Sequence, residues 1–400
     1  MNAPSPAQAA SPAPEATVGR AAMLRLRLAS ALPSTLAPLV AVALAAVVCG
    51  VILALSGHNP FSAYAEMISF GTTEGSLLVA ANKAVPLYLS AMAVAIGFKM
   101  GLFNIGVEGQ YLVAVVVAAA AGAQVDLFPP LHVAFIIVVA MLAGASWAIV
   151  PAVLKVTRNV SEVISTIMMN AIAAGTVAYM VNRWRDTSET QLIKTKEIPP
   201  SGWVGNLFQV SGAEKLSVFA LIAAGMGVIM WLVVTRTRFG FDLRISGANP
   251  TAAAVSGVNP KVMTIKVMLI SGAVAGTVGL PVLLSENIFH RYTQDFPTGV
   301  GFTGIAVALL GRNHPAGMAA AALLFGFLER AGQGLQLVDV PPEIVTIMQG
   351  VVLLAAVISY GVAERLGKVQ LQRATARELR AEDGPPNEDG EMLPVTGATS

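Results

Sequence analysis

Long uncharged stretches alternate with short polar segments along most of this 400-residue chain. An α-helix needs about 20 mainly apolar residues to cross the hydrocarbon core of a bilayer. The stretches that meet this requirement lie at residues 34–55, 76–98, 107–125, 131–154, 163–183, 216–235, 262–284, 316–336 and 342–362. A tenth stretch, 297–311, is shorter and rich in glycine, which predicts a re-entrant or broken helix buried by its neighbours. We therefore expect an all-α membrane protein with a bundle of about ten transmembrane helices, eight or nine being the alternatives.

The composition supports a membrane protein and argues against several other classes. Hydrophobic residues make up 55% of the chain and charged residues 12%, whereas soluble domains carry about a quarter charged residues. The net charge of +2 provides no basic surface for nucleic acid. Cys49 is the single cysteine and the four histidines lack metal-ligand spacing, so we expect neither an internal disulfide nor a metal site.

The two ends of the chain differ from its apolar middle. Residues 1–30 are rich in Pro, Ala and Ser, and residues 366–400 end in a segment rich in Pro, Gly and acidic residues. Both are expected to be largely disordered tails that flank a membrane domain at residues 31–365. The first apolar stretch is too long for a signal-peptide core and lacks a convincing cleavage site, so we expect it to be a retained span.

Basic residues predict the orientation of the chain. Cytoplasmic loops carry an excess of Lys and Arg, and basic clusters stand before the first span, at residues 20–27, and after the last, at residues 365–380. Both termini are therefore expected in the cytoplasm of a multi-pass protein of the cell membrane, which requires an even number of spans. The loop at 184–214 then falls outside although basic residues lie in and beside it, which weakens the case for ten.

The segment GLFNIGVEGQ, residues 101–110, places polar groups between two apolar stretches. Gly97 and Gly101 permit a helix break or close helix approach. One interpretation is an interrupted helix beside a translocation path, in which the amides of Asn104 and Gln110 bind a solute. The other is a cytoplasmic turn with Glu108 near a helix N-terminus, where the dipole favours an anion. Both interpretations stay open.

Polar and aromatic residues within the apolar stretches are the candidates for a substrate path. The candidates are Asn82, Lys83, Asn104, Glu108, Gln110, Asn170, Phe302 and Thr303. Lys83 either pairs with Glu108 inside the bundle or extends to one membrane face. Asn170 is an interhelical hydrogen-bonding residue or a solute contact, and Phe302 and Thr303 contact solute or pack in the core. Glu329 and Arg330 are adjacent, so they cannot share one helix face and each needs another partner.

The polar loop at residues 236–262 contains signals for a short helix. Asn249-Pro250 predicts a helix start, the small residues up to Ser256 continue it, and Gly257 ends it. Asn259-Pro260 then begins the next helix. A short helix with a smooth surface suits insertion into a groove of a partner protein, and an ordinary amphipathic loop is the alternative.

Four segments together resemble a known family. They are GLFNIGVEGQ (101–110), NVSEVISTIMMNAIA (159–173), ISGANPTAAAVSGVNPKV (245–262) and GFTGIAVALLGRNHPAG (301–317). They are similar to the integral-membrane permeases of ATP-binding-cassette (ABC) importers for branched-chain amino acids, simple sugars and nucleosides, with the nucleoside branch most alike. The resemblance covers roughly residues 34–365, in the order of the family. It implies the partners of such a permease: a cytoplasmic ATP-binding subunit, a second permease subunit that is identical or paralogous, and an extracytoplasmic solute-binding protein.

The resemblance also implies a role for the short helix. Thr251, Ala252, Ala253 and Gly257 correspond to the coupling segment that docks on the ATPase. Thr251 stands where the family's general pattern has glutamate, so a salt bridge from this position is in doubt.

Absent motifs limit the function further. The chain lacks a G-x-x-x-x-G-K-[ST] phosphate loop, so we expect no ATP hydrolysis by this chain and no cofactor, with ATP used by the partner subunit. The sequence also contains no carboxylate pair or nucleophile–base set of the kind that would indicate an enzyme. The expected function is import of a nucleoside or a similar small polar solute, with simple-sugar or branched-chain amino acid import as alternatives. A rival from another class is an ion-coupled secondary transporter with Glu108 and Glu162 as proton carriers.

Overall fold

The computed structural model describes residues 40, 42–188, 193–209, 215–285, 290–341, 343–355 and 358. Residues 42–357 form one compact unit, to which the following description refers. The predicted tails at 1–30 and 366–400, and the basic clusters used to predict topology, lie outside the described residues.

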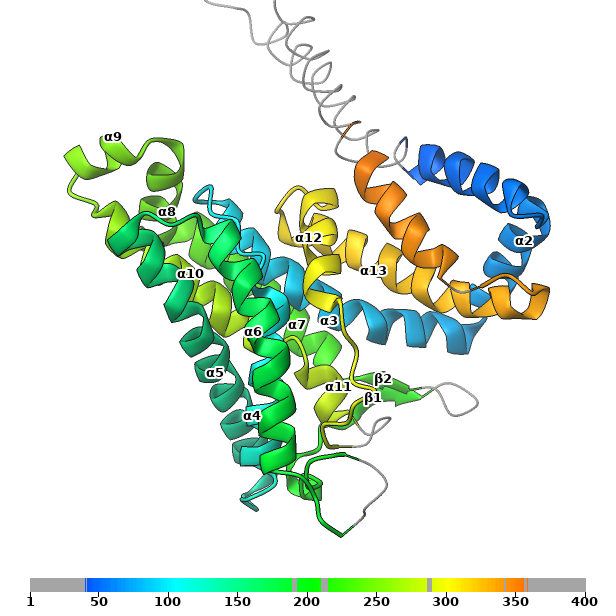
Figure 1. Ribbon diagram of the computed structural model, residues 1–400, viewed down its shortest axis with the longest axis horizontal. Coiled ribbons are helices and arrows are strands. Elements are labelled where there is room, and N and C mark those ends of the chain that lie inside the picture. The colour runs from blue at the N-terminus through cyan, green and yellow to red at the C-terminus, as the bar shows by residue number, and fades with distance from the viewer. Residues whose placement is uncertain are drawn as a thin grey trace, which may run out of the picture. The chain divides into compact units, whose positions relative to one another are not determined.

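Helices dominate the described chain (Figure 1). They are Val42–Leu55, α2 (Pro60–Gly71), α3 (Glu74–Phe98), α4 (Val107–Gly122), α5 (Pro129–Arg158), α6 (Glu162–Arg183), α7 (Phe219–Arg236), α8 (Arg238–Ala248), α9 (Pro250–Val255), α10 (Pro260–Gly276), α11 (Leu280–Leu284), α12 (Val300–Leu310), α13 (Pro315–Ala331) and Ile344–Ala355, with the 3-10 helices η1 (Pro200–Gly202) and η2 (Gly332–Val338). The strands β1 (Asn206–Gln209) and β2 (Lys215–Ser217) form an antiparallel pair in which Asn206 lies opposite Ser217.

The arrangement confirms an all-α membrane protein. Five helical segments are long and apolar enough to cross a membrane: α3, α5, α6, α7 and the combined segment Pro260–Leu284 that contains α10 and α11. Four shorter apolar helices accompany them in the described chain, at Val42–Leu55, Val107–Gly122, Val300–Leu310 and Ile344–Ala355. Each of the ten apolar stretches identified in the sequence contains a helix, and α12 occupies the stretch that predicted a short or broken one.

Helix α3 lies at the centre of the unit and packs against α7, α10, α12 and α13. It is buried on every face from Ala84 to Gly97, because alanine and glycine let its neighbours approach closely. On the other side of the unit α10 packs along α5. A Cβ atom at Gly144 would lie 2.2 Å from the carbonyl oxygen of Gly272, and one at Gly276 would lie 2.1 Å from that of Ala140. These glycines allow the two helix backbones to touch.

Two shorter helices begin inside the bundle. At about 1.5 Å per residue, the 11 residues of α12 extend about 16 Å, roughly half of a ~30 Å hydrocarbon core. A Cβ atom at Gly304, one turn into α12, would lie 1.9 Å from Oγ of Ser90 in the middle of α3. After α3 the chain folds back, because Gly101 adopts φ +70° and Asn104 reaches Ser271 within α10. Helix α4 therefore also starts within the bundle.

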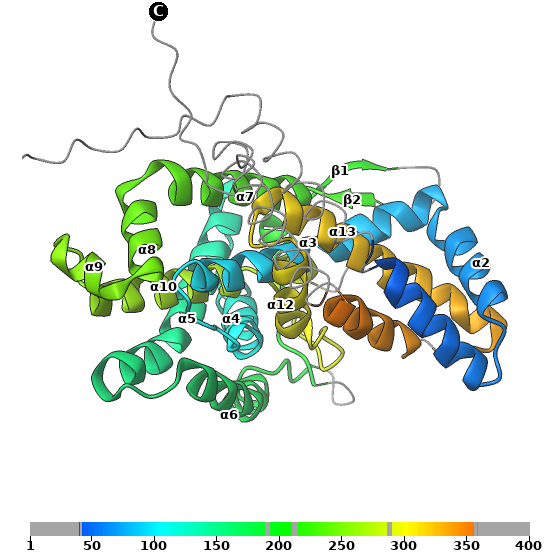
Figure 2. The same cartoon turned by 90° about the horizontal axis from the view of Figure 1, so that it is seen from above.

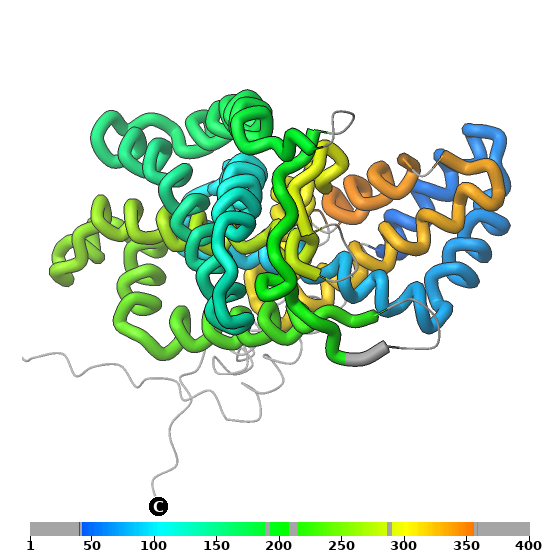
Figure 3. Tube along the Cα trace, turned by 90° about the horizontal axis from the view of Figure 1, so that it is seen from below, coloured from blue at the N-terminus to red at the C-terminus, as the bar shows by residue number. Residues whose placement is uncertain are grey.

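The segment after α6 is more structured than a loop. Residues 193–206, drawn in green, cross the bundle in Figure 3. Isolated β-bridges, which are single backbone pairings, join Lys194 to Thr293 and Val204 to Ser285. This segment therefore pairs with the chain that leads into α12. His132 of α5 is fully buried beside it, with its ring nitrogens 2.8 Å from Oγ of Ser201 and 3.0 Å from the carbonyl oxygen of Gly122.

The loop between α7 and α10 forms the predicted short helix. Helices α8 and α9 lie together beyond the end of α7 (Figures 1 and 2). The side chain of Asn249 caps α9 by accepting from the N–H groups of Thr251 and Ala252, and Asn259 caps α10 in the same way. Proline occupies the first position of each helix, and Gly257 has φ +82°. The two helix starts predicted at Asn249-Pro250 and Asn259-Pro260, and the turn predicted at Gly257, are therefore confirmed.

Candidate functional site

The N-termini of α4 and α12 meet around the carboxylate of Glu108. Its Oε1 accepts a hydrogen bond from the backbone N–H of Gly299 at 2.6 Å, and its Oε2 accepts from that of Gly301 at 2.7 Å. Glu108 lies in the first turn of α4 and is 7% exposed. Helix N-termini carry unpaired N–H groups and partial positive charge, so one buried carboxylate stabilises both helix ends.

The segment that leads into α12 fits closely against α4. A Cβ atom at Gly301 would lie 2.4 Å from the backbone nitrogen of Glu108, so only glycine permits this approach. The hydroxyl of Tyr111, one turn further along α4, donates to the carbonyl oxygen of Pro297. The start of α12 is thus held at three points by α4. The sequence analysis singled out Glu108, but nothing in the sequence paired it with Gly299 or Gly301.

Asn104 and Gln110 bind each other instead of facing open space. Nδ2 of Asn104 donates to Oε1 of Gln110 at 3.0 Å and to Oγ of Ser271 at 2.8 Å. Oδ1 of Asn104 accepts from Nε2 of Gln110 and from the backbone N–H of Gly106, both at 3.1 Å. An amide offers two donors and two acceptor positions, so Asn104 uses all four in this conformation. Both residues are buried, and contact with a solute stays a prediction.

Replacing Asn104 should destabilise the bundle. Asn104→Ala leaves the Gly106 N–H and the Gln110 amide with unpaired groups, for which we expect a loss of about 1–3 kcal/mol in the free energy of unfolding. Ser271→Ala removes the bond from Asn104 and the bond that the Ser271 hydroxyl donates to the carbonyl oxygen of Ala93, and should lower the free energy of unfolding by about 1.2 kcal/mol, at ~0.6 kcal/mol per bond. Unfolding in mixed micelles measures both. Asn182→Ala is the matched control, because that side chain is exposed and bonds only within its own helix. An Asn104→Ala protein as stable as wild type with lost uptake would instead indicate direct solute contact.

Asn170 joins α6 to the start of α4. Its Oδ1 accepts from the backbone N–H of Gly109 at 2.9 Å, and its Nδ2 donates to the carbonyl oxygen of Ile105 at 2.9 Å. The N–H of Gly109 belongs to the first turn of α4, where intrahelical partners are absent. This geometry agrees with the interhelical interpretation of Asn170.

Lys83 does not pair with Glu108, so that interpretation was wrong. Nζ of Lys83 on α3 instead forms an ion pair with Oε1 of Glu329 on α13. Arg330, the neighbour of Glu329, turns to another face, where it donates to Oγ of Ser76 and to Oε1 of Gln333. The two adjacent charges therefore find separate partners, as their positions on a helix require.

Two adjoining cavities share the Glu329 side chain. The first, which we call the Asn82 cavity, holds about 290 Å³ and is lined by Asn82, Lys83, Tyr111 and Phe296 among others. The second, the Gln349 cavity, holds about 420 Å³ and is lined by polar residues that include Thr298, Thr303, Gln333, Thr346 and Gln349. Leu87, Pro297, Val300 and Glu329 line both. The start of α12 thus forms a wall of each cavity.

Several polar groups of the Gln349 cavity have capacity to bind a solute. The side chains of Thr298, Thr346 and Gln349 make no hydrogen bond within the described part of the chain. Thr303 donates to the carbonyl oxygen of Gly299 at 3.1 Å and keeps its acceptor positions. Asn82, by contrast, is engaged with β2, since its amide bonds the carbonyl oxygen of Lys215 and the N–H of Ser217. Phe302 is 49% exposed and lies beside neither cavity wall.

The exposed surface of α9 differs in one position from the expected coupling surface. Thr251, Ala252 and Gly257 are exposed, but Ala253 is fully buried against the chain. Val255, which the sequence analysis did not single out, is 87% exposed. An exposed valine at the end of a short polar loop is the feature that a groove of a partner protein would accept.

Among the described residues, no group of three or more His, Cys, Asp and Glu side chains is placed to hold a metal ion. The fold and the site together define a polytopic helical membrane protein with two adjoining cavities between its helices. The family described as "Branched-chain amino acid transport system / permease component" matches residues 76–357, and the chain belongs to this family. The family is one of transport components, and its description names no catalytic activity.

Three relatives align over most of the chain. The guanosine ABC transporter permease NupP of Bacillus subtilis is 34% identical over 346 residues, 85% of this chain and 97% of that protein. The nucleoside ABC transporter permease NupB of Lactococcus lactis is 29% identical over 85% of this chain and 95% of its own length. The glucose ABC transporter permease TsgB13 of Haloferax volcanii is 30% identical, with 80% and 87% covered. No solved structure matches the chain.

Proposed function

We propose that this chain is the permease subunit of an ABC importer for nucleosides and that the Asn82 and Gln349 cavities lie on its solute path. The observation that carries the proposal is the alignment with a guanosine permease over 97% of that protein's length. The cavities agree with it, because pockets of about 300–1,000 Å³ with a few polar groups suit drug-sized ligands. The glucose permease among the relatives makes simple sugars the second candidate.

The chemistry of the cavities suits a neutral polyhydroxylated solute. The one carboxylate that lines both cavities, Glu329, is paired with Lys83, so the ion pair adds no net charge. A carboxylate oxygen accepts hydrogen bonds from the vicinal hydroxyls of a ribose, while amides and hydroxyls such as those of Gln349 and Thr346 match a base edge. Tyr111 and Phe296 offer aromatic surface. A nucleotide would bring charge that these groups do not balance.

Energy and solute delivery come from other subunits in this proposal. The exposed surface of α9 docks on a cytoplasmic ATP-binding subunit, and the basic clusters at residues 20–27 and 365–380 favour termini on the same side of the cell membrane. A second permease subunit completes the path, and an extracytoplasmic binding protein delivers the solute. ATP bound to the ATP-binding subunit and solute bound to the permease favour different states of such an assembly. The cavity therefore opens alternately to the outside and to the inside.

Substitution of Glu329 tests the solute path. Glu329→Gln keeps the shape of the side chain but removes the charge that accepts solute hydroxyls and pairs with Lys83, so we expect the KM for nucleoside uptake to rise about tenfold or more. This corresponds to the ~1.5–3 kcal/mol of a hydrogen bond to a charged group. Uptake of radiolabelled guanosine and adenosine by the assembled importer in proteoliposomes measures it.

Two controls separate solute binding from folding. Glu343→Gln changes an exposed carboxylate that lies outside both cavities and should leave uptake unchanged. The Lys83–Glu329 pair is partly exposed, with 30% and 44% of the side chains accessible, so its loss should hardly affect stability. Wild-type KM in Glu329→Gln would remove Glu329 from the path. Uptake of glucose but of no nucleoside by the wild-type importer would favour the sugar candidate.

A further inference from the structure

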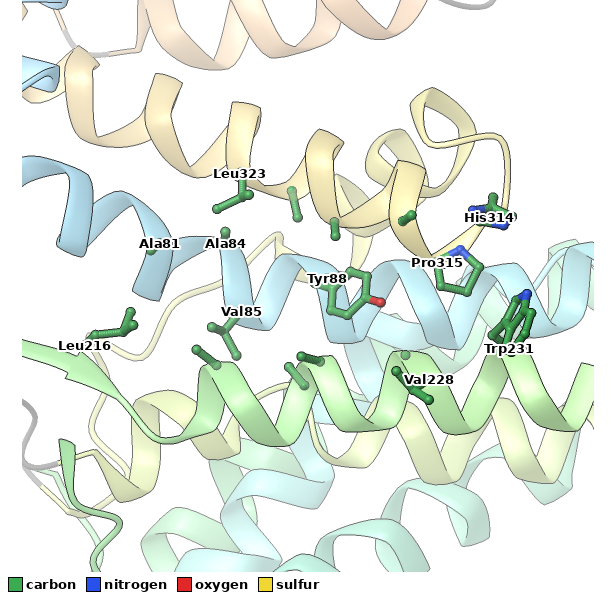
Figure 4. Close-up of a pocket in the computed structure, with 17 residues that line it drawn as sticks. Ala81, Ala84, Val85, Tyr88, Leu216, Val228, Trp231, His314, Pro315 and Leu323 are labelled. Carbon is green, nitrogen blue, oxygen red and sulfur yellow. The ribbon is translucent and has the colours of Figure 1, made fainter. Parts of the chain in front are cut away.

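An apolar groove runs between α3, α7 and α13 (Figure 4). It holds about 510 Å³ and is lined by residues 81–88 of α3, 216–231 around α7, and 314–323 around α13. Eight of the 17 lining residues are alanine, with Gly227, Val228 and Leu323 among the rest. Small side chains on three neighbouring helices leave a groove that no other described residue fills.

The dimensions of the groove distinguish between possible occupants. From Ala220 to Trp231 the groove follows 12 residues of α7, whose 11 steps of 1.5 Å make about 16 Å. This is close to half of a ~30 Å hydrocarbon core, the thickness of one leaflet. An extended acyl chain that reaches from the interface to the middle of the bilayer has about this length, whereas a transmembrane helix of ~30 Å runs about twice as far as the groove. The length of the groove therefore matches one acyl chain of a lipid in one leaflet.

The polar groups at one end of the groove suit a lipid headgroup. Trp231 and His314 face each other across this end, and the opposite end is closed by apolar residues such as Leu216 (Figure 4). The guanidinium of Arg236 lies over the Trp231 ring, 5.9 Å from its centroid. Tryptophan and arginine at the end of a membrane helix are typical of the interface, where lipid headgroups lie. A lipid phosphate would bring a negative charge to Arg236, which is exposed.

We propose that this groove binds an anionic phospholipid, with one acyl chain lying between α3, α7 and α13 and the phosphate beside Arg236. Helices α3 and α13 line the groove and also carry the Lys83–Glu329 pair, so a lipid in the groove would stabilise two helices that line the cavities. This inference depends on the membrane location of the chain and not on the identity of the transported solute.

Tryptophan quenching tests the proposal, because Trp231 lies in the groove. Phenylalanine replaces Trp147, Trp184 and Trp203, and the full-length chain is reconstituted into phosphatidylcholine vesicles with increasing brominated phosphatidylglycerol or brominated phosphatidylcholine. We expect the anionic lipid to quench Trp231 at an about fivefold lower mole fraction, the ratio given by ~1 kcal/mol per basic residue at the membrane surface. Arg236→Gln should make the two quenching curves coincide, while Arg183→Gln, an exposed arginine at the end of α6, should not.

Filling the groove provides an independent arm of the test. Ala224 is exposed and lines the groove, so Ala224→Phe should reduce quenching without a change in helix content by circular dichroism. Ile229→Phe is the matched control, because Ile229 is 61% exposed on α7 and does not line the groove. Equal quenching by the two lipids in the Trp231 protein would mean ordinary boundary lipid and overturn the proposal. An unquenched Trp231 would mean that a second copy of the chain covers the groove, which overturns it equally.

Discussion

Glu108→Ala should reduce the free energy of unfolding by about 3–6 kcal/mol and abolish uptake. The carboxylate accepts two backbone hydrogen bonds at the start of α12, from Gly299 and Gly301, and lies almost fully buried. Each bond to a charged group is worth about 1.5–3 kcal/mol, and both N–H groups would be left without a partner in an apolar interior. Equilibrium unfolding in mixed micelles measures the change. A Glu108→Ala protein as stable as wild type would mean that Glu108 does not hold α12.

Glu108→Gln separates this structural role from proton transport. The amide oxygen of glutamine keeps one of the two hydrogen bonds and its NH₂ group cannot accept the other, so about half of the destabilisation should remain. Uptake driven by ATP should persist at a reduced rate, whereas an ion-coupled transporter that carries protons on Glu108 would lose it. Glu66→Gln, on α2 and distant in sequence from this site, is the control for a change of charge.

Val255→Asp should abolish coupling to the ATP-binding subunit while the chain inserts normally into the membrane. Val255 is 87% exposed at the end of α9, and burying a carboxylate in the groove of a partner is strongly unfavourable. We expect the affinity for the ATP-binding subunit to fall at least about 30-fold, or ~2 kcal/mol, with loss of solute-stimulated ATP hydrolysis. Pull-down in detergent and ATPase assays measure the two effects.

Matched variants make the test of α9 specific. Val255→Thr keeps the shape and adds no charge, so it should couple nearly normally, and Leu207→Asp adds the same charge to an exposed position on the β1 strand. Ala253→Arg is less informative, because Ala253 is fully buried and an arginine there would displace α9 before any partner binds. Normal coupling in Val255→Asp would exclude this surface of α9 as the docking site.

The sequence predicted the elements well where the signals are local. Each apolar run of sufficient length contains a helix and the short glycine-rich run marked α12, whereas α2 and α8 lie outside the predicted runs. The Asn-Pro pairs at 249–250 and 259–260 predicted two helix starts, because the side-chain cap and the restricted proline act within a few residues. Gly257 adopts the positive φ that its position after α9 indicated.

The sequence predicted which residues of the site are polar but not what they contact. One of two interpretations paired Lys83 with Glu108, yet the partner of Lys83 lies 246 residues further along the chain, at Glu329. One of two interpretations gave Asn104 and Gln110 amides that bind a solute, but in the structure these two side chains bind each other. Such pairings depend on the depth and rotation of each helix, and the spacing of polar residues in the sequence does not determine either quantity.

The sequence by itself therefore determined the membrane class, the helical segments and the caps of α9, because hydrophobic length and capping act over short distances. Only the tertiary structure decided that two helix N-termini meet at Glu108, that two cavities share Glu329, and that Val255 rather than Ala253 is exposed on α9. The physical reason is that helix faces are chosen by packing. Small residues such as Gly301 and Gly304 allow close approach, and the buried polar groups then bond to whatever that packing brings within reach.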